Sequence, residues 1–271
     1  LYSKESKLLE VGFKSFGCKK IVYDAEKDKI KGIPVLGSVD CLESDGDADL
    51  EQSKITAKES LSELLKRFSS VSEHFIKNCF PQYADDIEVG ETNFLTNKLE
   101  RSCEGENLNK CELLHLDATA CNPVNNKRII RVYSNINPDG ESRVWSVGED
   151  FCKVIKKFAP QVPRPMLFSR TLMKLFGRTS HVRSLYDHYM LSINKLMQKD
   201  KEYQDSVSIE KVEFAAGSSW MTFSDEVSSG VLSGQYVLEQ VFYLPVGSMK
   251  HSEKSPLKKL QKFYGKAILD I

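Results

Sequence analysis

The spacing of hydrophobic positions divides the chain into helical and strand-like stretches. Residues 57–79 carry hydrophobic side chains three or four positions apart, which predicts an amphipathic helix, and Pro81 follows it as a stop signal. The same spacing returns in a helical insertion over residues 149–200, most clearly from His181 to Lys199. The tail, residues 253–271, interleaves lysines with hydrophobic residues and is predicted to form a basic helix.

Strand patterns occupy residues 111–147 and 207–245, on either side of the helical insertion. Residues 1–55 show short apolar islands and are expected to be irregular. The order of helix, strands, helical insertion and strands does not alternate as βαβ units would. We therefore predict a mainly β protein with helices, a double-stranded β-helix (jelly roll) flanked by α-helices. It is expected to form one domain over residues 1–271, of which residues 1–110 are a divergent N-terminal part.

Composition excludes several broad classes. The 271 residues are 41% hydrophobic and 28% charged, as in ordinary globular proteins, and 38 basic residues balance 38 acidic ones. No whole-molecule charge therefore favours nucleic acid as a partner. The seven cysteines include no Cys-x-x-Cys pair, so we expect reduced thiols in a cytosolic setting and no zinc ribbon.

Candidate metal chemistry begins at His115 and Asp117, a His-x-Asp pair at the end of a predicted strand. Imidazole nitrogen and carboxylate oxygen at this spacing can occupy adjacent corners of one ferrous ion. The facial triad of non-haem iron oxygenases also needs a second, distant histidine. The simpler alternative is a strand end whose two polar side chains face water.

A candidate anion site follows at Arg131, in the middle of the strand predicted over residues 128–135. With the alternation of a strand, Arg131, Tyr133 and Asn135 share one face. A buried guanidinium needs a carboxylate, which a five-carbon diacid would supply through two hydrogen bonds. An internal salt bridge is the other reading of Arg131, and the sequence leaves both open.

Several blocks of the sequence occur together in a characteristic order. They are residues 113–118 (LLHLDA), 131–138 (RVYSNINP), 143–145 (RVW), 186–191 (YDHYML), 217–220 (GSSW) and 233–240 (SGQYVLEQ). In this order they resemble the Kdo hydroxylases, bacterial Fe(II)/2-oxoglutarate-dependent dioxygenases. These enzymes oxidise the 3-deoxy-D-manno-oct-2-ulosonic acid (Kdo) sugar of the lipopolysaccharide inner core.

The resemblance implies a set of ligands and site residues. His115 and Asp117 would be catalytic iron ligands, and Fe(II), 2-oxoglutarate and dioxygen the cofactor and cosubstrates. The cofactor-binding residues would be Arg131, Asn135 and Gln240, and the substrate-binding residues Arg143 and His188. Which arginine serves which acidic ligand stays open.

The resemblance also implies a lipid-linked Kdo substrate at the cytoplasmic leaflet of the inner membrane. The basic tail, residues 253–271, offers a peripheral contact with an anionic membrane surface. Its alternative is a solvated lysine face whose apolar side docks on the body of the protein.

The sequence departs from the family at Ser229, where the distal iron-binding histidine would fall. A serine hydroxyl is a much poorer ferrous ligand than imidazole, so we predict weak iron affinity and impaired hydroxylation. The alternatives are a non-catalytic homologue that binds an acidic sugar in the same fold, and a cupin-type sugar isomerase or epimerase.

Overall fold

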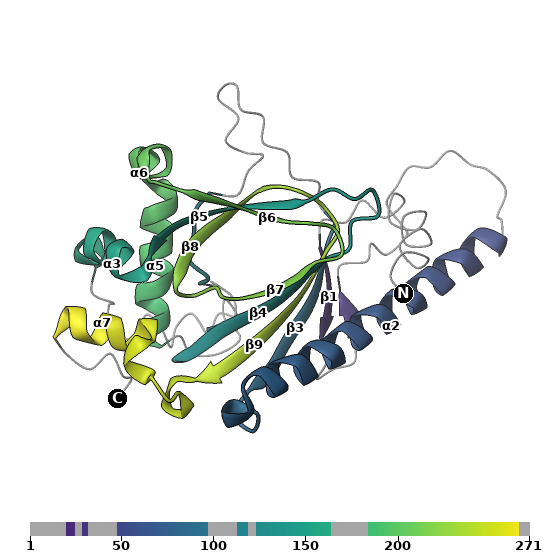
Figure 1. The fold of residues 1–271 in the computed structure, drawn as a ribbon, viewed down its shortest axis with the longest axis horizontal. Coiled ribbons are helices and arrows are strands. Elements are labelled where there is room, and N and C mark those ends of the chain that lie inside the picture. The colour runs from purple at the N-terminus through teal and green to yellow at the C-terminus, as the bar shows by residue number, and fades with distance from the viewer. Residues whose placement is uncertain are drawn as a thin grey trace.

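The computed structural model describes residues 20–24, 29–31, 48–96, 113–118, 123–163 and 184–265. Two antiparallel sheets lie at the centre, with one long helix along the larger sheet and the remaining helices gathered on the other side of the molecule (Figure 1). The predicted class, mainly β with flanking helices, is confirmed. Over the described residues the two sheets do not close into a barrel.

The larger sheet contains, in spatial order, β2 (Lys29–Lys31), β1 (Lys20–Asp24), β3 (Glu88–Leu95), β9 (Val237–Pro245), β4 (Lys127–Asn135) and β7 (Ser219–Phe223). The smaller sheet contains β6 (Glu210–Phe214), β5 (Arg143–Asp150) and β8 (Val227–Ser233). The α-helices are α2 (Ala48–Cys79), α3 (Phe151–Phe158), α5 (Leu185–Lys199), α6 (Lys201–Ser206) and α7 (Pro256–Tyr264). Short 3-10 turns occupy Pro81–Tyr83, Ala159–Gln161, Val246–Ser248 and Ser252–Lys254.

Helix α2 covers the outer face of the larger sheet. Its apolar stripe, which includes Leu61, Leu65 and Phe68, packs in one cluster with Ile130 and Val132 of the sheet. Because side chains alternate along a strand, the neighbouring Arg131 and Tyr133 point to the opposite face, between the two sheets. The periodicity of the sequence therefore places these two residues correctly.

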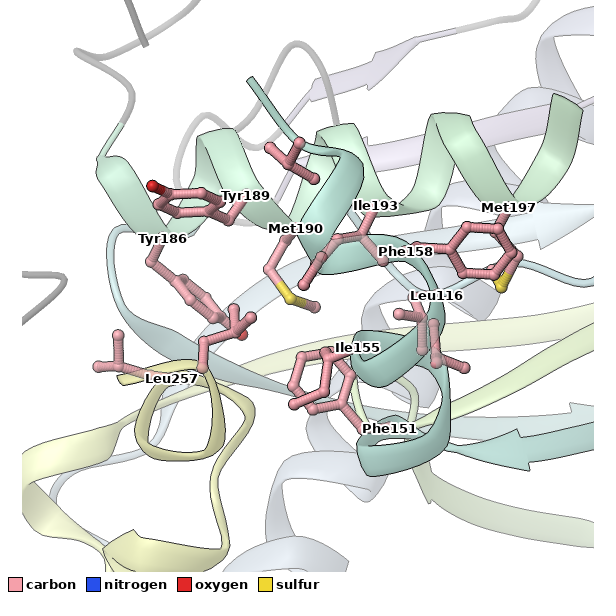
Figure 2. Packing of buried hydrophobic residues seen from close by; sticks show 14 of the residues in the cluster. Leu116, Phe151, Ile155, Phe158, Tyr186, Tyr189, Met190, Ile193, Met197 and Leu257 are labelled. Atoms are coloured by element: carbon pink, nitrogen blue, oxygen red, sulfur yellow. The ribbon is translucent and has the colours of Figure 1, made fainter. Parts of the chain in front are cut away.

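A second core joins the helices on the other side of the molecule (Figure 2). Helix α5 contributes Tyr186, Met190 and Ile193, which pack with buried residues of α3 and α7 and with Leu116. Ser184 and Asp187 form a reciprocal capping box at its start, so α5 begins at Leu185. Residues 181–183 of the predicted helix lie outside the described residues.

A third cluster fills one end of the space between the sheets. The ring of Trp145 meets Tyr133 and Trp220 edge to face, at centroid distances of 5.0 and 5.7 Å. Phe214 stacks on Trp220 at 3.8 Å. These aromatic side chains pack between the inner faces of the two sheets and hold them together. The charged residues lie in the rest of the space between the sheets.

Several sequence predictions are corrected here. Residues 1–55 are not irregular throughout, because they contain β1, β2 and the start of α2 at Ala48, nine residues before the predicted start. Strand β3 was not predicted, whereas β8 lies within the predicted strand region of residues 207–245. β8 is rich in serine and glycine, which disfavour strands, and it forms because β5 pairs along it.

The C-terminal prediction is partly confirmed. Helix α7 begins at Pro256 after the Ser255 cap and ends at Tyr264, where Gly265, whose φ of 64° is left-handed, forms the C-terminal cap. It is therefore shorter than the predicted span of 253–271. Residues 266–271 lie outside the described residues.

Candidate functional site

The segment that carries His115 and Asp117 lies against strand β8. His115 N–H donates to the Ser229 carbonyl oxygen and Ser229 N–H donates to the His115 carbonyl oxygen, both at 3.0 Å. In an antiparallel pair that exchanges both hydrogen bonds, the two side chains project from the same face, with Cα atoms about 5.5 Å apart. The residue at the distal-histidine position therefore stands directly across from His115, between the sheets.

Helices α5 and α6 hold the other side of this segment. The Gln204 side chain accepts from Leu114 N–H at 2.9 Å and donates to the Leu114 carbonyl oxygen at 3.0 Å. Asn194 accepts from Leu116 N–H at 3.1 Å. Sequence reasoning missed both residues. Asn194 did carry a signal, since it is a polar residue within the apolar stripe of a predicted helix.

Hydrogen bonding orients the imidazole of His115. Its Nδ1 lies 2.9 Å from the Leu113 carbonyl oxygen, which can only accept, so Nδ1 carries the proton. In the neutral imidazole, Nε2 then keeps its lone pair. This is the arrangement found in most metal-binding histidines, where the second ring nitrogen donates to a carbonyl or carboxylate.

Asp117 is buried in a cationic environment. Arg131 Nε donates to its Oδ2 at 2.5 Å, and the Ser224 hydroxyl donates to the same oxygen at 2.7 Å. Burial alone would raise the pKa of Asp117, but the charge of Arg131 and these hydrogen bonds outweigh it and lower the pKa below its usual value. Asp117 is therefore ionised at neutral pH.

Glu239 of β9 completes the charged group, and the sequence did not point to it. Arg131 Nη1 lies 2.8 Å from Glu239 Oε1, while Asn93 Nδ2 donates to Glu239 Oε2 at 2.5 Å. Burial would lower the pKa of Arg131, but Asp117 and Glu239 raise it well above its ordinary value. Burial, followed by the charge of Glu239, raises the pKa of Tyr133 well above 10.0. We call Asp117, Arg131 and Glu239 the inner cluster.

Two predicted cofactor-binding residues do not join the inner cluster. Gln240 faces the other side of the larger sheet, where it bonds Thr92 and the carbonyl oxygens of Gly90 and Val241. Asn135 donates to the Glu141 and Phe214 carbonyl oxygens and accepts from Asn137 N–H, so its amide holds the turn between β4 and β5. In these positions both side chains support the fold, and neither reaches Asp117.

The two predicted substrate-binding residues lie apart from each other. Arg143 of β5 is 4% exposed and donates to the Gly234 carbonyl oxygen at 2.9 Å, at the turn between β8 and β9. His188 lies on α5, outside the sheets, with Nε2 3.1 Å from the Pro163 carbonyl oxygen. The structure thus brings together His115, Asp117, Arg131 and Ser229, while His188 belongs to the helical layer.

A small cavity adjoins the inner cluster on the side of α5. It is lined by Asp117, Ala118, Val124, Tyr186, Asp187 and Met190. The Asp187 carboxylate accepts hydrogen bonds there from the backbone N–H groups of Val124 and Asn125, which holds the loop that leads into β4. Within the described residues, no group of three or more histidine, cysteine, aspartate or glutamate side chains is placed to hold a metal ion.

Comparison with known proteins identifies the relatives of this arrangement. A scan against protein families matches residues 1–267 to "3-deoxy-D-manno-oct-2-ulosonic acid (Kdo) hydroxylase". The chain belongs to the Kdo hydroxylase family. The match includes the N-terminal part that we predicted to be divergent, and a search of curated proteins found no match.

Solved structures of a Kdo hydroxylase, KdoO, described as a non-heme Fe(II) alphaketoglutarate dependent dioxygenase, share the fold. The form with succinate and Fe(III) is 35% identical, with a TM-score of 0.81 over 98% of this chain and 83% of that chain. The form with alphaketoglutarate and Fe(III) is 34% identical over 99% and 84%, with the same TM-score. The apo form is 35% identical over 99% and 84%, with a TM-score of 0.82. The jelly-roll prediction is confirmed by these Kdo hydroxylases.

Proposed function

We propose that this protein hydroxylates Kdo in a reaction that depends on Fe(II) and 2-oxoglutarate. The observation that carries the proposal is the position of His115 and Asp117, side by side between the sheets and facing Ser229. Membership of the family and the ligands of KdoO support the same chemistry.

The residues present fit a ferrous ion at two corners of the facial triad. His115 offers the lone pair of Nε2, and Asp117 is an ionised carboxylate whose Oδ1 accepts no hydrogen bond from the described residues. At the third corner Ser229 offers a neutral hydroxyl, which is a weak ferrous ligand. We therefore propose that His115 and Asp117 hold the iron, with lower affinity than a complete triad would give.

Other residues of the chain prepare this site. Gln204 and Asn194 keep the segment of His115 at a fixed distance from β8, and Arg131 keeps Asp117 ionised. Arg131 and Arg143 are the cations that we propose for the carboxylates of 2-oxoglutarate and Kdo. When bound, iron with 2-oxoglutarate and dioxygen supplies the oxidant for a C–H bond of the sugar, and succinate and carbon dioxide are released.

The experiment compares the protein with its Ser229→His variant. Mn(II) titration by calorimetry is expected to show at least about tenfold tighter binding in the variant, because an imidazole replaces a hydroxyl across from His115. Succinate formed from 2-oxoglutarate in the presence of a Kdo-containing acceptor is expected to rise in parallel. Ser219→His is the matched control, since Ser219 is an exposed serine on β7.

Equal Mn(II) affinity of the protein and its Ser229→His variant would contradict the ligand assignment. A second function is favoured by Ser229 itself, namely a homologue that binds an acidic sugar without turnover. In that case free Kdo binds to the unchanged protein, as measured by calorimetry. Succinate then forms only with the Ser229→His variant.

For the acceptor we propose lipid-linked Kdo at the cytoplasmic face of the inner membrane, reached through the basic helix α7. Leu257 and Leu260 are buried in the helical core, and Lys259 pairs with Glu226, so the apolar face of α7 is docked. The exposed remainder, Lys258, Lys262 and Phe263, is what we propose to contact anionic headgroups. No helix in the described part of the chain is long and apolar enough to cross a bilayer.

Co-sedimentation with vesicles tests the membrane proposal. Anionic vesicles are expected to retain the protein at low salt and to lose it when Lys258 and Lys262 are both changed to glutamine. Neutral vesicles serve as the control for non-specific adsorption. Retention that does not change with the double substitution would remove α7 from the proposal.

A further inference from the structure

The turn between β7 and β8 brings one hydroxyl group to Asp117. The Ser224 hydroxyl donates to Asp117 Oδ2 at 2.7 Å, and Asp117 N–H donates to the Ser224 carbonyl oxygen at 3.1 Å. The two residues are 107 positions apart in the chain, so the sequence does not point to this contact. Ser224 is thus bound to Asp117 through both its side chain and its backbone.

The turn that carries Ser224 is anchored on two sides. Asp225 accepts hydrogen bonds from the Arg128 side chain of β4. The Glu226 carbonyl oxygen accepts from Phe151 N–H, at the start of α3, at 2.9 Å. Because the neighbouring residues of the turn are held in this way, the Ser224 hydroxyl has a fixed position beside Asp117.

Arg128 and Arg131 show two ways in which an arginine of β4 binds an aspartate. Arg128 forms a fork, in which Nε donates to Asp225 Oδ2 at 2.8 Å and Nη2 donates to Oδ1 at 3.0 Å, so both carboxylate oxygens are engaged. Arg131 binds Asp117 through Nε alone and at Oδ2 alone. Nη1 of Arg131 contacts Glu239, and Nη2 makes no hydrogen bond with the residues that the structure describes. Half of the edge that Arg128 uses is therefore unused in Arg131.

An aspartate beside this half-used edge could rotate its carboxylate and form the same fork. Two parallel N–H···O bonds bind a carboxylate more strongly than one. Such a fork would engage Oδ1 of Asp117, the oxygen that is left for a metal. Ser224 opposes the rotation, because its hydroxyl donates to the same oxygen as Arg131 Nε and holds the carboxylate by a second bond.

We infer that Ser224 is a positioning residue of the site, which prevents Asp117 from forming a fork with Arg131 and so keeps Oδ1 open as a metal ligand. Ser224 acts through Asp117 and is not itself a ligand. The inference rests on the proposed function, because it takes Asp117 as a ligand of the metal. The competing account is that the Ser224 hydroxyl only stabilises the fold.

The experiment measures Mn(II) affinity by calorimetry in the Ser229→His background. Ser224→Ala is expected to weaken binding by about tenfold, as is typical when a residue that orients a metal ligand is removed. Ser224→Thr keeps a hydroxyl and is expected to bind within about twofold of its parent. Ser146→Ala is the matched control, because it removes a hydroxyl that bonds the Gly230 carbonyl oxygen at 3.2 Å, outside the inner cluster. This control is expected to leave the affinity unchanged.

A further pair of variants separates positioning from general stabilisation. A lysine carries one ammonium group and cannot form a fork with a carboxylate. In the Arg131→Lys background, Ser224→Ala is therefore expected to weaken Mn(II) binding by no more than about twofold. Melting temperatures measured without metal show which variants fold, and are expected to fall similarly for Ser224→Ala and Ser146→Ala. Where Arg131→Lys does not fold, the contrast between Ser224→Ala and Ser224→Thr decides.

Each result supports or overturns the inference. Unchanged Mn(II) affinity in Ser224→Ala, or an equal loss in Ser224→Ala and Ser224→Thr, overturns it and leaves the proposed function intact. A loss from Ser224→Ala that is as large in the Arg131→Lys background also overturns it, because a fork is then not the cause. If Ser229→His binds Mn(II) no better than the natural sequence, the ligand assignment itself is wrong and both proposals fail.

Discussion

Two arginines three positions apart on β4 build ion clusters on opposite faces of the larger sheet. Arg131 points between the sheets and meets Asp117 and Glu239. Arg128 is buried and points to the other face of the sheet, away from the space between the sheets. There it donates two hydrogen bonds to Asp225, pairs with Glu226 and lies 4.6 Å from the centre of the Phe223 ring. Glu226 in turn pairs with Lys259 of α7. We call Arg128, Asp225, Glu226 and Lys259 the outer cluster.

The two clusters differ in charge balance and in what they leave open. The outer cluster contains two cations and two carboxylates, and its pairs connect the turn between β7 and β8 to a helix. The inner cluster contains one cation for two carboxylates, beside an imidazole whose Nε2 keeps its lone pair. A cluster with equal numbers of positive and negative side chains stabilises the fold. A cluster with one surplus negative charge, beside an imidazole nitrogen that can donate its lone pair, attracts a further cation.

The largest expected effect is on the outer cluster. Arg128→Gln leaves Asp225, with a 1% exposed side chain, as a buried and unpaired carboxylate, which typically costs about 3–5 kcal/mol of unfolding free energy. Urea unfolding measures it. Mn(II) is expected not to restore this stability, because none of the histidines that the structure describes bonds to Asp225. Recovery of stability in Mn(II) would contradict the distinction between the two clusters.

The sequence pointed to His115, Asp117 and Ser229, which the structure brings together, but not to most of the residues around them. His115 and Asp117 form a local motif, and the resemblance to the family aligns Ser229 with the distal iron-binding histidine. The structure pairs His115 with Ser229 across an isolated β-bridge. The members of the family share the strand order of a jelly roll. Short sequence blocks in the family's order are therefore enough to predict this strand order.

The sequence does not place a side chain where a shift of one residue decides the face of a strand. In Val237–Val241 both faces of β9 carry apolar and polar residues, so the sequence does not show which of two neighbours points inward. The resemblance implies Gln240 as a cofactor-binding residue, which stays a prediction, whereas Glu239 is the residue that faces Arg131. Gln204 and Asn194 could not be assigned either, since their contacts to the 113–118 segment span 90 and 78 residues of sequence.

The two clusters should contribute differently to the pH dependence of the unfolding free energy at mildly acidic pH. Burial raises the pKa of Asp225 to about 6, in spite of Arg128, whereas the pKa of Asp117 is lowered. An unfolded aspartate has a pKa of about 3.9. The folded state therefore binds a proton at Asp225 more tightly, and this contribution to stability is present below about pH 4 and lost as the pH rises through about 6.

The measurement is the unfolding free energy of the protein and of Asp225→Asn between pH 4 and 7. The stability difference between the two is expected to fall by about 2–3 kcal/mol as the pH rises over this range. Asp117 does not interfere, because its contribution is lost only as the pH falls through its lowered pKa, below 3.8. A difference that grows with pH would mean that pairing with Arg128 outweighs burial.

A smaller effect is expected from the support behind the inner cluster. Gln204→Leu removes the side chain that satisfies both backbone groups of Leu114, which should cost about 1–3 kcal/mol. The outer cluster has no contact with Gln204, so its pH response should stay unchanged. Mn(II) affinity in the Ser229→His background should drop by about tenfold, because the segment of His115 loses a fixed position. An unchanged affinity would show that the pairing with β8 is sufficient to position the histidine.

The smallest effect is expected at the edge of the outer cluster. Lys259 and Glu226 are 22% and 25% exposed, so solvent weakens their attraction, and Lys259→Ala should cost only about 0.5–1 kcal/mol. Glu226 keeps Arg128 as a partner after the substitution, at 2.7 Å, and is not left unpaired. Thermal unfolding at low and high salt measures the change, and high salt should reduce it further. Lys258→Ala, at an exposed lysine of the same helix turn, is the control and should have no effect on stability. A loss for Lys259→Ala as large as that for Arg128→Gln would mean that α7 is part of the buried ion network itself.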